Sequence, residues 1–370
     1  MTYITLTVNP SIDVTYPDSP PIVAGGTNRV GSRIVSAGGK GINLSRALFA
    51  LGERRVETLF FANKSSKTGS LLCSMLDAPM GEETDNPEIS EEITEASEAS
   101  EESKASKPSE AEETRKKSEL CLPYTPIPYA DPEKQTRICI KISSEDGSLT
   151  EINETGESIT REDMMSLVSY LAELIATDGQ KIFMLCGSIP QTVEIPVYNL
   201  LIKLMKSCGI TCVLDSSGRG LSEGIKEQPS LIKPNLEELC ALAGRKLDFD
   251  GSAVEYSKQL FHSYGCEVLL TNGGKGAYYV GSRGVIKATP PEICHSLSTG
   301  TVGCGDLFLA CFVRAYYGQG RSAVEALRLA TGYAAYMADS YPDTDLSRLI
   351  DGQRLEQMNK LAHGVRIEEK

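Results

Sequence analysis

Two glycines, one small residue and a carboxylate stand together in Thr301-Val302-Gly303-Cys304-Gly305-Asp306, directly before an apolar run over 307–313. Glycines allow a sharp turn and a close approach to a ligand. The run predicts a helix, whose first amides are unpaired and whose dipole favours an anion. A carboxylate at such a place suits proton abstraction from a hydroxyl that attacks a phosphate. The stretch therefore indicates phosphoryl transfer, with a plain helix N-terminus as the alternative.

A second glycine turn opens a predicted helix at Gly38-Gly39-Lys40-Gly41-Ile42-Asn43. It is shorter than a Walker loop and lacks the Ser or Thr that such a loop places after its lysine. Its backbone amides and Lys40 could hold an anion or contact a sugar, and Asn43 would face the same opening. Asp13, after the predicted first strand 3–8, is either a turn-forming residue or an acceptor for sugar hydroxyls.

The stretch 136–142 alternates apolar and polar residues and predicts a half-exposed strand. Arg137 and Lys141 fall on one face of it, with Cys139 between them. This face is either solvated or a cationic wall for a phosphate. Residues 149–153 are the expected partner strand.

From about residue 160, short apolar strands alternate with amphipathic helices, which predicts a mostly parallel sheet covered on both faces. The helices are expected over 161–176, 193–208, 251–264, 321–338 and 346–362, and the strands over 181–186, 210–214, 267–271 and 277–280. In such sheets ligands bind beyond the carboxyl ends of the strands. Five residues fall at such ends: Asp13, Gly187, Asp215, Lys233 and Thr271.

The net charge of −13 comes mainly from one segment, because residues 82–113 hold thirteen Asp or Glu and two Lys and so carry −11. The remainder is near −2, which disfavours nucleic acid or a membrane surface as partner. The eleven Cys form no CxxC pair and there are three His, so neither a zinc site nor a disulfide framework is expected. The N-terminus does not resemble a signal peptide and no long apolar run occurs, so we expect a cytoplasmic protein.

Residues 77–118 are rich in Glu, Ser, Ala and Lys and lack aromatic residues. Such a segment buries too little apolar surface to offset the entropy of ordering. We expect a disordered acidic insertion, either solvated filler or a regulatory segment.

Several of these motifs together resemble the ribokinase-like (PfkB) carbohydrate kinases, and most of all their branch of 1-phosphofructokinases and tagatose-6-phosphate kinases. The resemblance covers nearly the whole chain outside 77–118. The matching stretches, in the family's order, are Val8–Asp13, Gly38–Asn43, Thr136–Ile138, Thr150–Asn153, Gly187–Pro190, Lys233–Asn235 with Glu238, and Thr301–Asp306.

The resemblance implies one kinase domain over 1–370 with a three-layer α/β/α fold, a mostly parallel central sheet and a small β-sheet lid. The lid strands would lie at about 14–36 and 120–153. Closing such a lid over the sugar excludes water and limits wasteful ATP hydrolysis.

The resemblance also implies roles for individual residues. Asp306 would be the general base, and the amides of Gly303, Cys304 and Gly305 the anion hole. ATP is the implied donor and Mg²⁺ the implied cofactor, held by Asn235 and Glu238 largely through water. Lys233, Asn235, Thr271, Gly273 and Gly276 would bind the nucleotide, and Asp13, Gly38, Gly39, Lys40, Asn43 and Arg137 the phosphosugar, with Lys40 and Arg137 on its phosphate.

The implied reaction is the conversion of fructose 1-phosphate to fructose 1,6-bisphosphate, with tagatose-6-phosphate kinase as the rival within the class. A catalytically weak sugar-phosphate or nucleotide sensor is the rival from another class. Cys304 stands where the family usually has Ala, and Leu307 where Ser is common, which bears on rate rather than on reaction type. A homodimer through the lid strands is the expected assembly.

Overall fold

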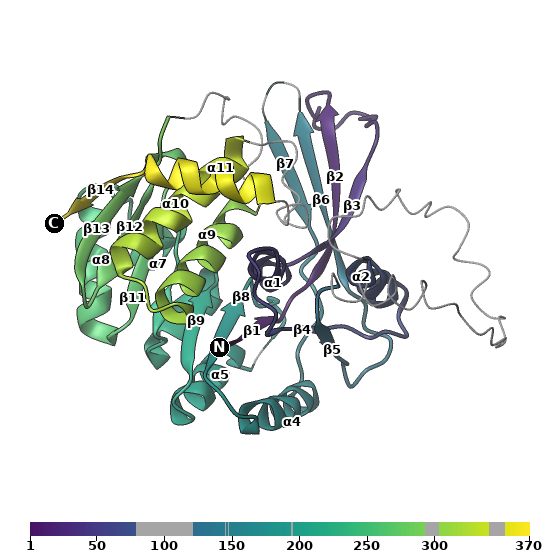
Figure 1. Ribbon diagram of the computed structural model, residues 1–370. Coiled ribbons are helices and arrows are strands. Elements are labelled where there is room, and N and C mark those ends of the chain that lie inside the picture. The colour runs from purple at the N-terminus through teal and green to yellow at the C-terminus, as the bar shows by residue number, and fades with distance from the viewer. Residues whose placement is uncertain (79–120, 145, 147, 194, 293–302, 340–351) are drawn as a thin grey trace, which may run out of the picture.

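Two sheets of unequal size organise the protein (Figure 1). The computed structural model describes residues 1–78, 121–144, 146, 148–193, 195–292, 303–339 and 352–370. The expected acidic insertion at 77–118 therefore lies almost entirely outside the described residues, as do Thr301 and Val302.

The large sheet has ten strands in the order β14-β13-β12-β11-β10-β9-β8-β1-β4-β5. Pairing is parallel from β11 to β5 and antiparallel from β11 to β14. The strands are β1 (Thr2–Thr7), β4 (Val56–Phe61), β5 (Tyr124–Ile127), β8 (Lys181–Cys186), β9 (Thr211–Asp215), β10 (Leu231–Ile232), β11 (Glu267–Thr271), β12 (Ala277–Gly281), β13 (Gly284–Thr289) and β14 (Arg366–Glu369).

Helices cover both faces of this sheet, because alternate residues of each buried strand point to opposite sides. In β1, Tyr3 belongs to one buried core and Ile4 to the other. The first core packs on α1 (Lys40–Ala50), α2 (Lys67–Asp77), α9 (Cys304–Val313), α10 (Ala323–Asp339) and α11 (Gly352–His363). The second packs on α4 (Arg161–Ala176), α5 (Val197–Ser207), α6 (Gly218–Gly224), α7 (Leu236–Ala243) and α8 (Ser252–Tyr264). The three-layer α/β/α architecture is as expected.

The small sheet stands above the carboxyl ends of the parallel strands (Figure 1). It has four strands in the order β3-β2-β6-β7. These are β2 (Ser11–Ser19), β3 (Ile34–Gly38), β6 (Arg137–Ser144) and β7 (Leu149–Asn153).

The structure corrects two parts of the expected lid. Residues 20–33 form no strand; instead the side chain of Asn28 closes a turn, with the Val23 amide donating to its Oδ1 at 2.8 Å. The stretch 124–127 belongs to the large sheet, where β5 pairs with β4 and Tyr124 stacks on Phe60. A short apolar stretch fits either sheet, and pairing with a distant strand decides which one it joins.

Candidate active site

The carboxyl ends of the parallel strands bring the predicted residues to one edge of the large sheet. Asp215 ends β9, Lys233 follows β10, and Thr271 ends β11. Thr271 forms a parallel bridge with Asn235, and its amide donates to the carbonyl of Pro234 at 3.1 Å. Residues from three separate stretches of the chain are therefore adjacent, as expected for a ligand site of an α/β sheet.

Asp306 lies in the first turn of α9, which begins after Gly303. Gly303 has a φ of 83°, a left-handed conformation that glycine adopts readily, and its carbonyl accepts from the amides of Asp306 and Leu307 at 3.1 and 2.9 Å. Asp306 is 8% exposed, and its Oδ2 accepts a hydrogen bond from Asn43 Nδ2 at 3.0 Å. Helix α1, through Asn43, thus fixes a buried carboxylate at the start of α9.

The pKa of Asp306 is raised from its ordinary value of 3.8 to about 6. Burial is the largest cause and the charge of Asp215 the second, while Lys40, Asn43 and Lys233 act in the opposite direction. A carboxylate with such a pKa is ionised at neutral pH yet accepts a proton more readily than an exposed aspartate, which suits a general base.

Two lysines share the carboxylate of Asp215, which is almost fully buried. Lys40 Nζ lies 3.1 Å and Lys233 Nζ 3.3 Å from the same Asp215 Oδ1. Burial alone would raise the pKa of Asp215, but Lys233 and Lys40 together lower it. Burial alone would lower the pKa of Lys40, but Asp215, Glu238 and Asp306 raise it. Lys40 is therefore charged at neutral pH, and both lysines lie close enough to Asp306 to affect its pKa.

Lys233 also faces the start of α9. A Cβ built on Gly305 would lie 3.8 Å from Lys233 Nζ. The helix leaves its first amides without partners from its own backbone. An anion at the start of α9 would therefore meet these amides and the Lys233 ammonium together.

Asn235 and Glu238 form the capping box of α7. Asn235 Oδ1 accepts from the Glu238 amide at 2.7 Å, and Glu238 Oε2 accepts from the Asn235 amide at 2.9 Å. The other oxygen of Glu238, Oε1, lies 3.6 Å from Lys40 Nζ. The spacing of these residues thus has a structural role in helix capping besides the expected ligand role.

The side chains of this region bear on how Mg²⁺ could bind. Within the described part of the chain, no three Asp, Glu, His or Cys side chains converge on one point. Both oxygens of Glu238 already have partners. This donor set fits an ion held mostly by phosphate oxygens and water, which is how Mg²⁺ commonly binds beside nucleotides.

The predicted nucleotide glycines lie in the turn between β11 and β12. Gly273 begins a 3-10 turn, Gly273–Lys275, and Gly276 has a φ of 96°. A Cβ on Gly276 would lie 2.1 Å from the carbonyl oxygen of Ala288 in β13. The close approach of β13 is therefore enough to require glycine at this position, without any ligand. The turn follows Thr271 directly and thus continues the same edge of the sheet.

The glycine turn before α1 is closely packed against β1 and β2. A Cβ on Gly38 would lie 2.2 Å from Asp13 Oδ1, and one on Gly39, whose φ is 125°, would lie 2.8 Å from Thr7 Cγ2. The missing side chain at Gly38 lets Asp13 lie against the turn that leads into α1.

Asp13 itself is held on both oxygens. Ser11 Oγ donates to Oδ1 at 2.6 Å, and Lys141 Nζ lies 2.8 Å from Oδ2. The sequence predicted Lys141 on a strand face that is either solvated or a cationic wall for a phosphate, and Asp215 at a strand end where ligands bind, but it assigned neither residue a definite role. Lys141 shares a strand face with Arg137, and Asp215 is the acidic residue at a strand end, so signals for both were present.

Arg137 lies where the small sheet meets the large one. Its two terminal nitrogens donate to the carbonyls of Glu154 and Asn9, at 3.1 and 3.2 Å. Its Nε is buried and has no hydrogen-bond partner among the described residues. Asn9 is in turn bonded to the carbonyl of Thr155 at 3.1 Å. The guanidinium is therefore anchored to backbone.

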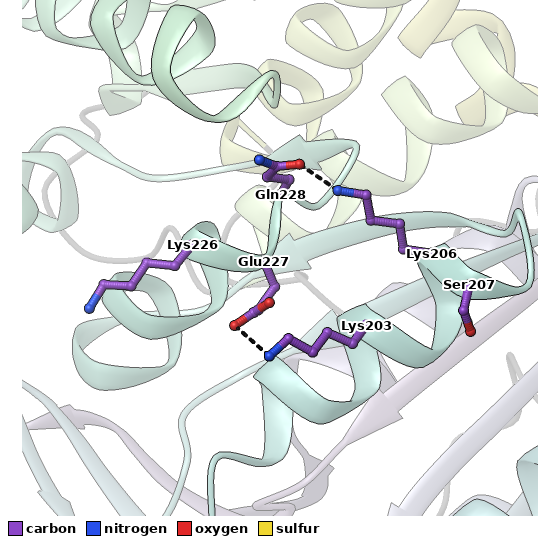
Figure 2. A pocket seen from close by; sticks show the side chains of 6 residues that line it. All are labelled: Lys203, Lys206, Ser207, Lys226, Glu227 and Gln228. Atoms are coloured by element: carbon purple, nitrogen blue, oxygen red, sulfur yellow. Dashed lines mark hydrogen bonds and ion pairs between the residues drawn. The ribbon is translucent and has the colours of Figure 1, made fainter.

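A surface hollow of about 430 Å³ lies elsewhere, and Figure 2 shows its lining: Lys203, Lys206, Ser207, Lys226, Glu227 and Gln228. Lys203 Nζ pairs with Glu227 Oε1 at 3.3 Å. Helix α5 and the short turn Ile225–Glu227 lead into the amino ends of β9 and β10. The hollow is thus at the opposite edge of the sheet and contains none of the predicted site residues.

Solved structures with this arrangement of layers define the class of fold. Phosphofructokinase-2 of Escherichia coli, solved with substrates and products, superposes with a TM-score of 0.73 at 22% identity, covering 98% of this chain and 99% of that one. Ribokinase of Arabidopsis thaliana, with ribose and ATP, superposes with a TM-score of 0.63 at 17% identity, covering 98% of each. The fold is therefore ribokinase-like.

The family follows from the sequence itself. Residues 128–347 match the pfkB family of carbohydrate kinases. This match spans more than half of the chain, and the protein belongs to that family. The expected resemblance is confirmed.

Two curated relatives indicate which kinases of the family this chain is similar to. A 1-phosphofructokinase of Haemophilus influenzae is 32% identical over 204 residues, which cover 55% of this chain and 63% of the relative. A tagatose-6-phosphate kinase of Staphylococcus epidermidis is 28% identical over 311 residues, covering 83% of each. In the described residues, no helix is long and apolar enough to cross a membrane.

Proposed function

We propose that this protein transfers the terminal phosphoryl group of ATP to a hydroxyl of a ketohexose phosphate, converting fructose 1-phosphate to fructose 1,6-bisphosphate. The observation that carries the proposal is the placement of Asp306. It is a buried carboxylate in the first turn of α9, bonded to Asn43 and flanked by Lys40 and Lys233. The similarity to a 1-phosphofructokinase supports the acceptor.

In the proposed reaction, Asp306 takes the proton of the attacking hydroxyl. Asn43 donates to Oδ2 and so leaves Oδ1 to receive that proton. Because its pKa is raised to about 6, the Asp306 carboxylate is a stronger base than an ordinary aspartate and holds the proton that it takes from the hydroxyl. The oxygen that loses the proton then attacks the phosphorus, and the bond from that phosphorus to ADP breaks.

The amides at Gly303, Cys304 and Gly305 form the proposed anion hole for the transferring group. Lys233, which faces Gly305, adds a positive charge beside it. Charge develops on the phosphoryl oxygens during transfer, so fixed donors at this point lower the barrier. The thiol of Cys304 has a pKa raised to about 12 by burial and by Asp306, so it contributes its amide rather than a thiolate.

The nucleotide is proposed to bind along the edge formed by Lys233, Asn235, Thr271, Gly273 and Gly276. Asn235 and Glu238 would orient the water shell of a Mg²⁺ bound to the phosphates. When bound, the ion neutralises phosphate charge during transfer. Lys40 pairs with Asp215 and Glu238. Its positive charge is therefore proposed to act on the phosphoryl group that is transferred as well as on the acceptor.

The acceptor is proposed to lie between the glycine turn and the small sheet. Asp13, Gly38, Gly39 and Asn43 would contact its hydroxyls. Arg137 would contact the phosphate that the acceptor already carries. The hydrogen bonds of Arg137 go to neutral backbone carbonyls, so they leave its positive charge to interact with that phosphate.

Tagatose 6-phosphate is the second candidate acceptor, favoured by a relative that aligns over 83% of both chains. One coupled assay distinguishes the acceptors: ADP production with fructose 1-phosphate, tagatose 6-phosphate and fructose 6-phosphate. We expect the highest kcat/KM with fructose 1-phosphate. A higher value with tagatose 6-phosphate would favour the second candidate, and no turnover with any acceptor would favour a sugar-phosphate or nucleotide sensor.

A homodimer through the small sheet is the proposed assembly. Two apolar side chains on its outer strands are more than half exposed, Ile34 at 57% and Ile152 at 58%. Burying such side chains against a second copy removes apolar surface from water. Sedimentation of the protein with Ile152→Asp should show monomer where the unaltered chain shows dimer.

A further inference from the structure

The small sheet has one face turned to α2 and one turned to the site. Val14 and Val35 point to the first face, where they pack with the core that includes Leu72 of α2. Side chains alternate along a strand, so Asp13 points to the other face. Asp13 lies beside Gly38, the last residue of β3, and β3 leads directly into α1. Because Lys40 and Asn43 of α1 contact Asp215 and Asp306, this end of the second face is next to the site.

Lys141 occupies this second face and is largely enclosed. Its side chain is 15% exposed, whereas that of Lys203 on α5 is 63% exposed. Its ammonium pairs with Asp13 Oδ2, at 2.8 Å. Lysines are rarely enclosed unless favourable contacts offset the free energy needed to desolvate the ammonium. One ion pair to Asp13 uses only one of the three N–H donors of an ammonium.

Arg137 lies four residues before Lys141 on the same strand face, and its side chain is held more tightly. Both of its terminal nitrogens are committed to backbone carbonyls at 3.1 and 3.2 Å. An ammonium on a flexible stem can keep one bond to Asp13 and direct its other donors to a phosphate. Charge-assisted bonds of this kind are among the stronger contacts in proteins.

We propose that Lys141 is a specificity-determining residue that contacts the phosphate already carried by the acceptor, while holding Asp13 for the sugar hydroxyls. The assignment rests on the proposed function, since it names a contact of the same acceptor. It predicts that the protein selects sugar monophosphates over free sugars through Lys141 as well as Arg137.

The test is Lys141→Gln, because the amide can still donate to Asp13 but carries no charge. We expect the KM for fructose 1-phosphate to rise about 10- to 100-fold, the size expected for the loss of a charge-assisted bond. The inhibition constant of inorganic phosphate, measured in competition with the sugar phosphate, should rise in parallel. The kcat and the KM for ATP should stay within about threefold, and Lys141→Arg should restore most of the loss.

Lys206→Met, at the opposite edge of the sheet, is the matched control and should change none of these constants. An unchanged KM in Lys141→Gln, or a lower kcat with an unchanged inhibition constant for phosphate, would mean that Lys141 only holds Asp13 and would overturn the proposal. Unaltered protein that phosphorylates no sugar phosphate would instead overturn the proposed function, and this assignment with it.

If Lys141→Gln is too unstable to assay, the unaltered protein supplies the same test. Lysine acylation followed by peptide mass spectrometry should show Lys141 protected by fructose 1-phosphate, but not by fructose or by ATP. Equal protection by fructose would contradict a phosphate contact.

Discussion

Asp306 is the residue on which the proposed chemistry depends, and the isosteric variant Asp306→Asn tests it. Loss of a general base lowers turnover by about 10²- to 10⁴-fold, so we expect a kcat reduced by that much with ATP binding nearly unchanged. Steady-state rates and nucleotide titration measure the two effects. A kcat close to that of the unaltered protein would remove Asp306 from the reaction.

The same variant makes a prediction about stability. A folded-state pKa of about 6 against an ordinary 3.8 means that the folded protein holds this proton more tightly than the unfolded chain. The contribution of Asp306 to stability is therefore present below pH 3.8 and is lost as the pH rises through about 6. At pH 7 its ionisation costs about 1–3 kcal/mol, so Asp306→Asn should unfold at a higher temperature than the unaltered protein.

The pH dependence of the rate tests the electrostatic coupling of Asp306 to Asp215. Asp306 must be ionised to act as a base, so kcat/KM should fall as the pH drops below about 6. The negative charge of Asp215 raises the pKa of Asp306, so Asp215→Asn should move this acidic limb to lower pH. The pH profile of Thr160→Ala, whose change lies in the cap of α4, provides the reference. An acidic limb that stays in place would rule out the coupling.

At the scale of single elements, α7 and α4 carry the same kind of cap, but of these two only α7 is at the site. Asn235 and Glu238 cap α7 beside the proposed nucleotide, and Thr160 and Asp163 cap α4. Removing either cap side chain with alanine should cost about 1 kcal/mol in the free energy of unfolding. Asn235→Ala alone should also raise the KM for ATP.

Thermal unfolding and the KM for ATP, measured on Asn235→Ala and Thr160→Ala, separate capping from ligand binding. Equal KM values in the two variants, with equal losses of stability, would leave Asn235 with a structural role only. This comparison is needed because the spacing of Asn235 and Glu238 satisfies a helix cap and a nucleotide site equally well.

The elements show where sequence patterns suffice and where they do not. The helix at 161–176 is found over the residues expected for it, because Thr160 and Asp163 supply its start signal locally. Helix α2 and strands β13 and β14 were not expected. In β13 and β14, neighbouring strands supply the stabilising contacts, and short stretches of four to six residues carry little periodicity of their own.

At the scale of the molecule, the segment between α2 and β5 can be tested by removal. Its composition predicts that residues 82–113 contribute nothing to a packed core. The described ends on either side are already joined, since Tyr124 donates to Asp77 Oδ1 at 2.7 Å. Replacing 82–113 with a short Gly-Ser linker should therefore leave a soluble protein with an unchanged unfolding temperature.

Circular dichroism melting of that deletion measures the outcome, and the kinase assay shows whether the segment affects the site. A change in KM without a change in stability would assign it a regulatory role. Loss of soluble expression would contradict the prediction that it lies outside the fold.

The sequence by itself determined the class of fold, the family and the candidate residues, because these depend on local patterns: strand and helix periodicity, glycine turns, and residues at strand ends. The tertiary structure decided which of them meet. Asn43 bonds Asp306 from 263 positions away, and Lys40 reaches Asp215 from 175. The tertiary structure also pairs Lys141 with Asp13, and it places residues 124–127 in the large sheet rather than in the expected lid. Contacts of this kind depend on how distant strands pair and pack, which no local pattern in the chain encodes.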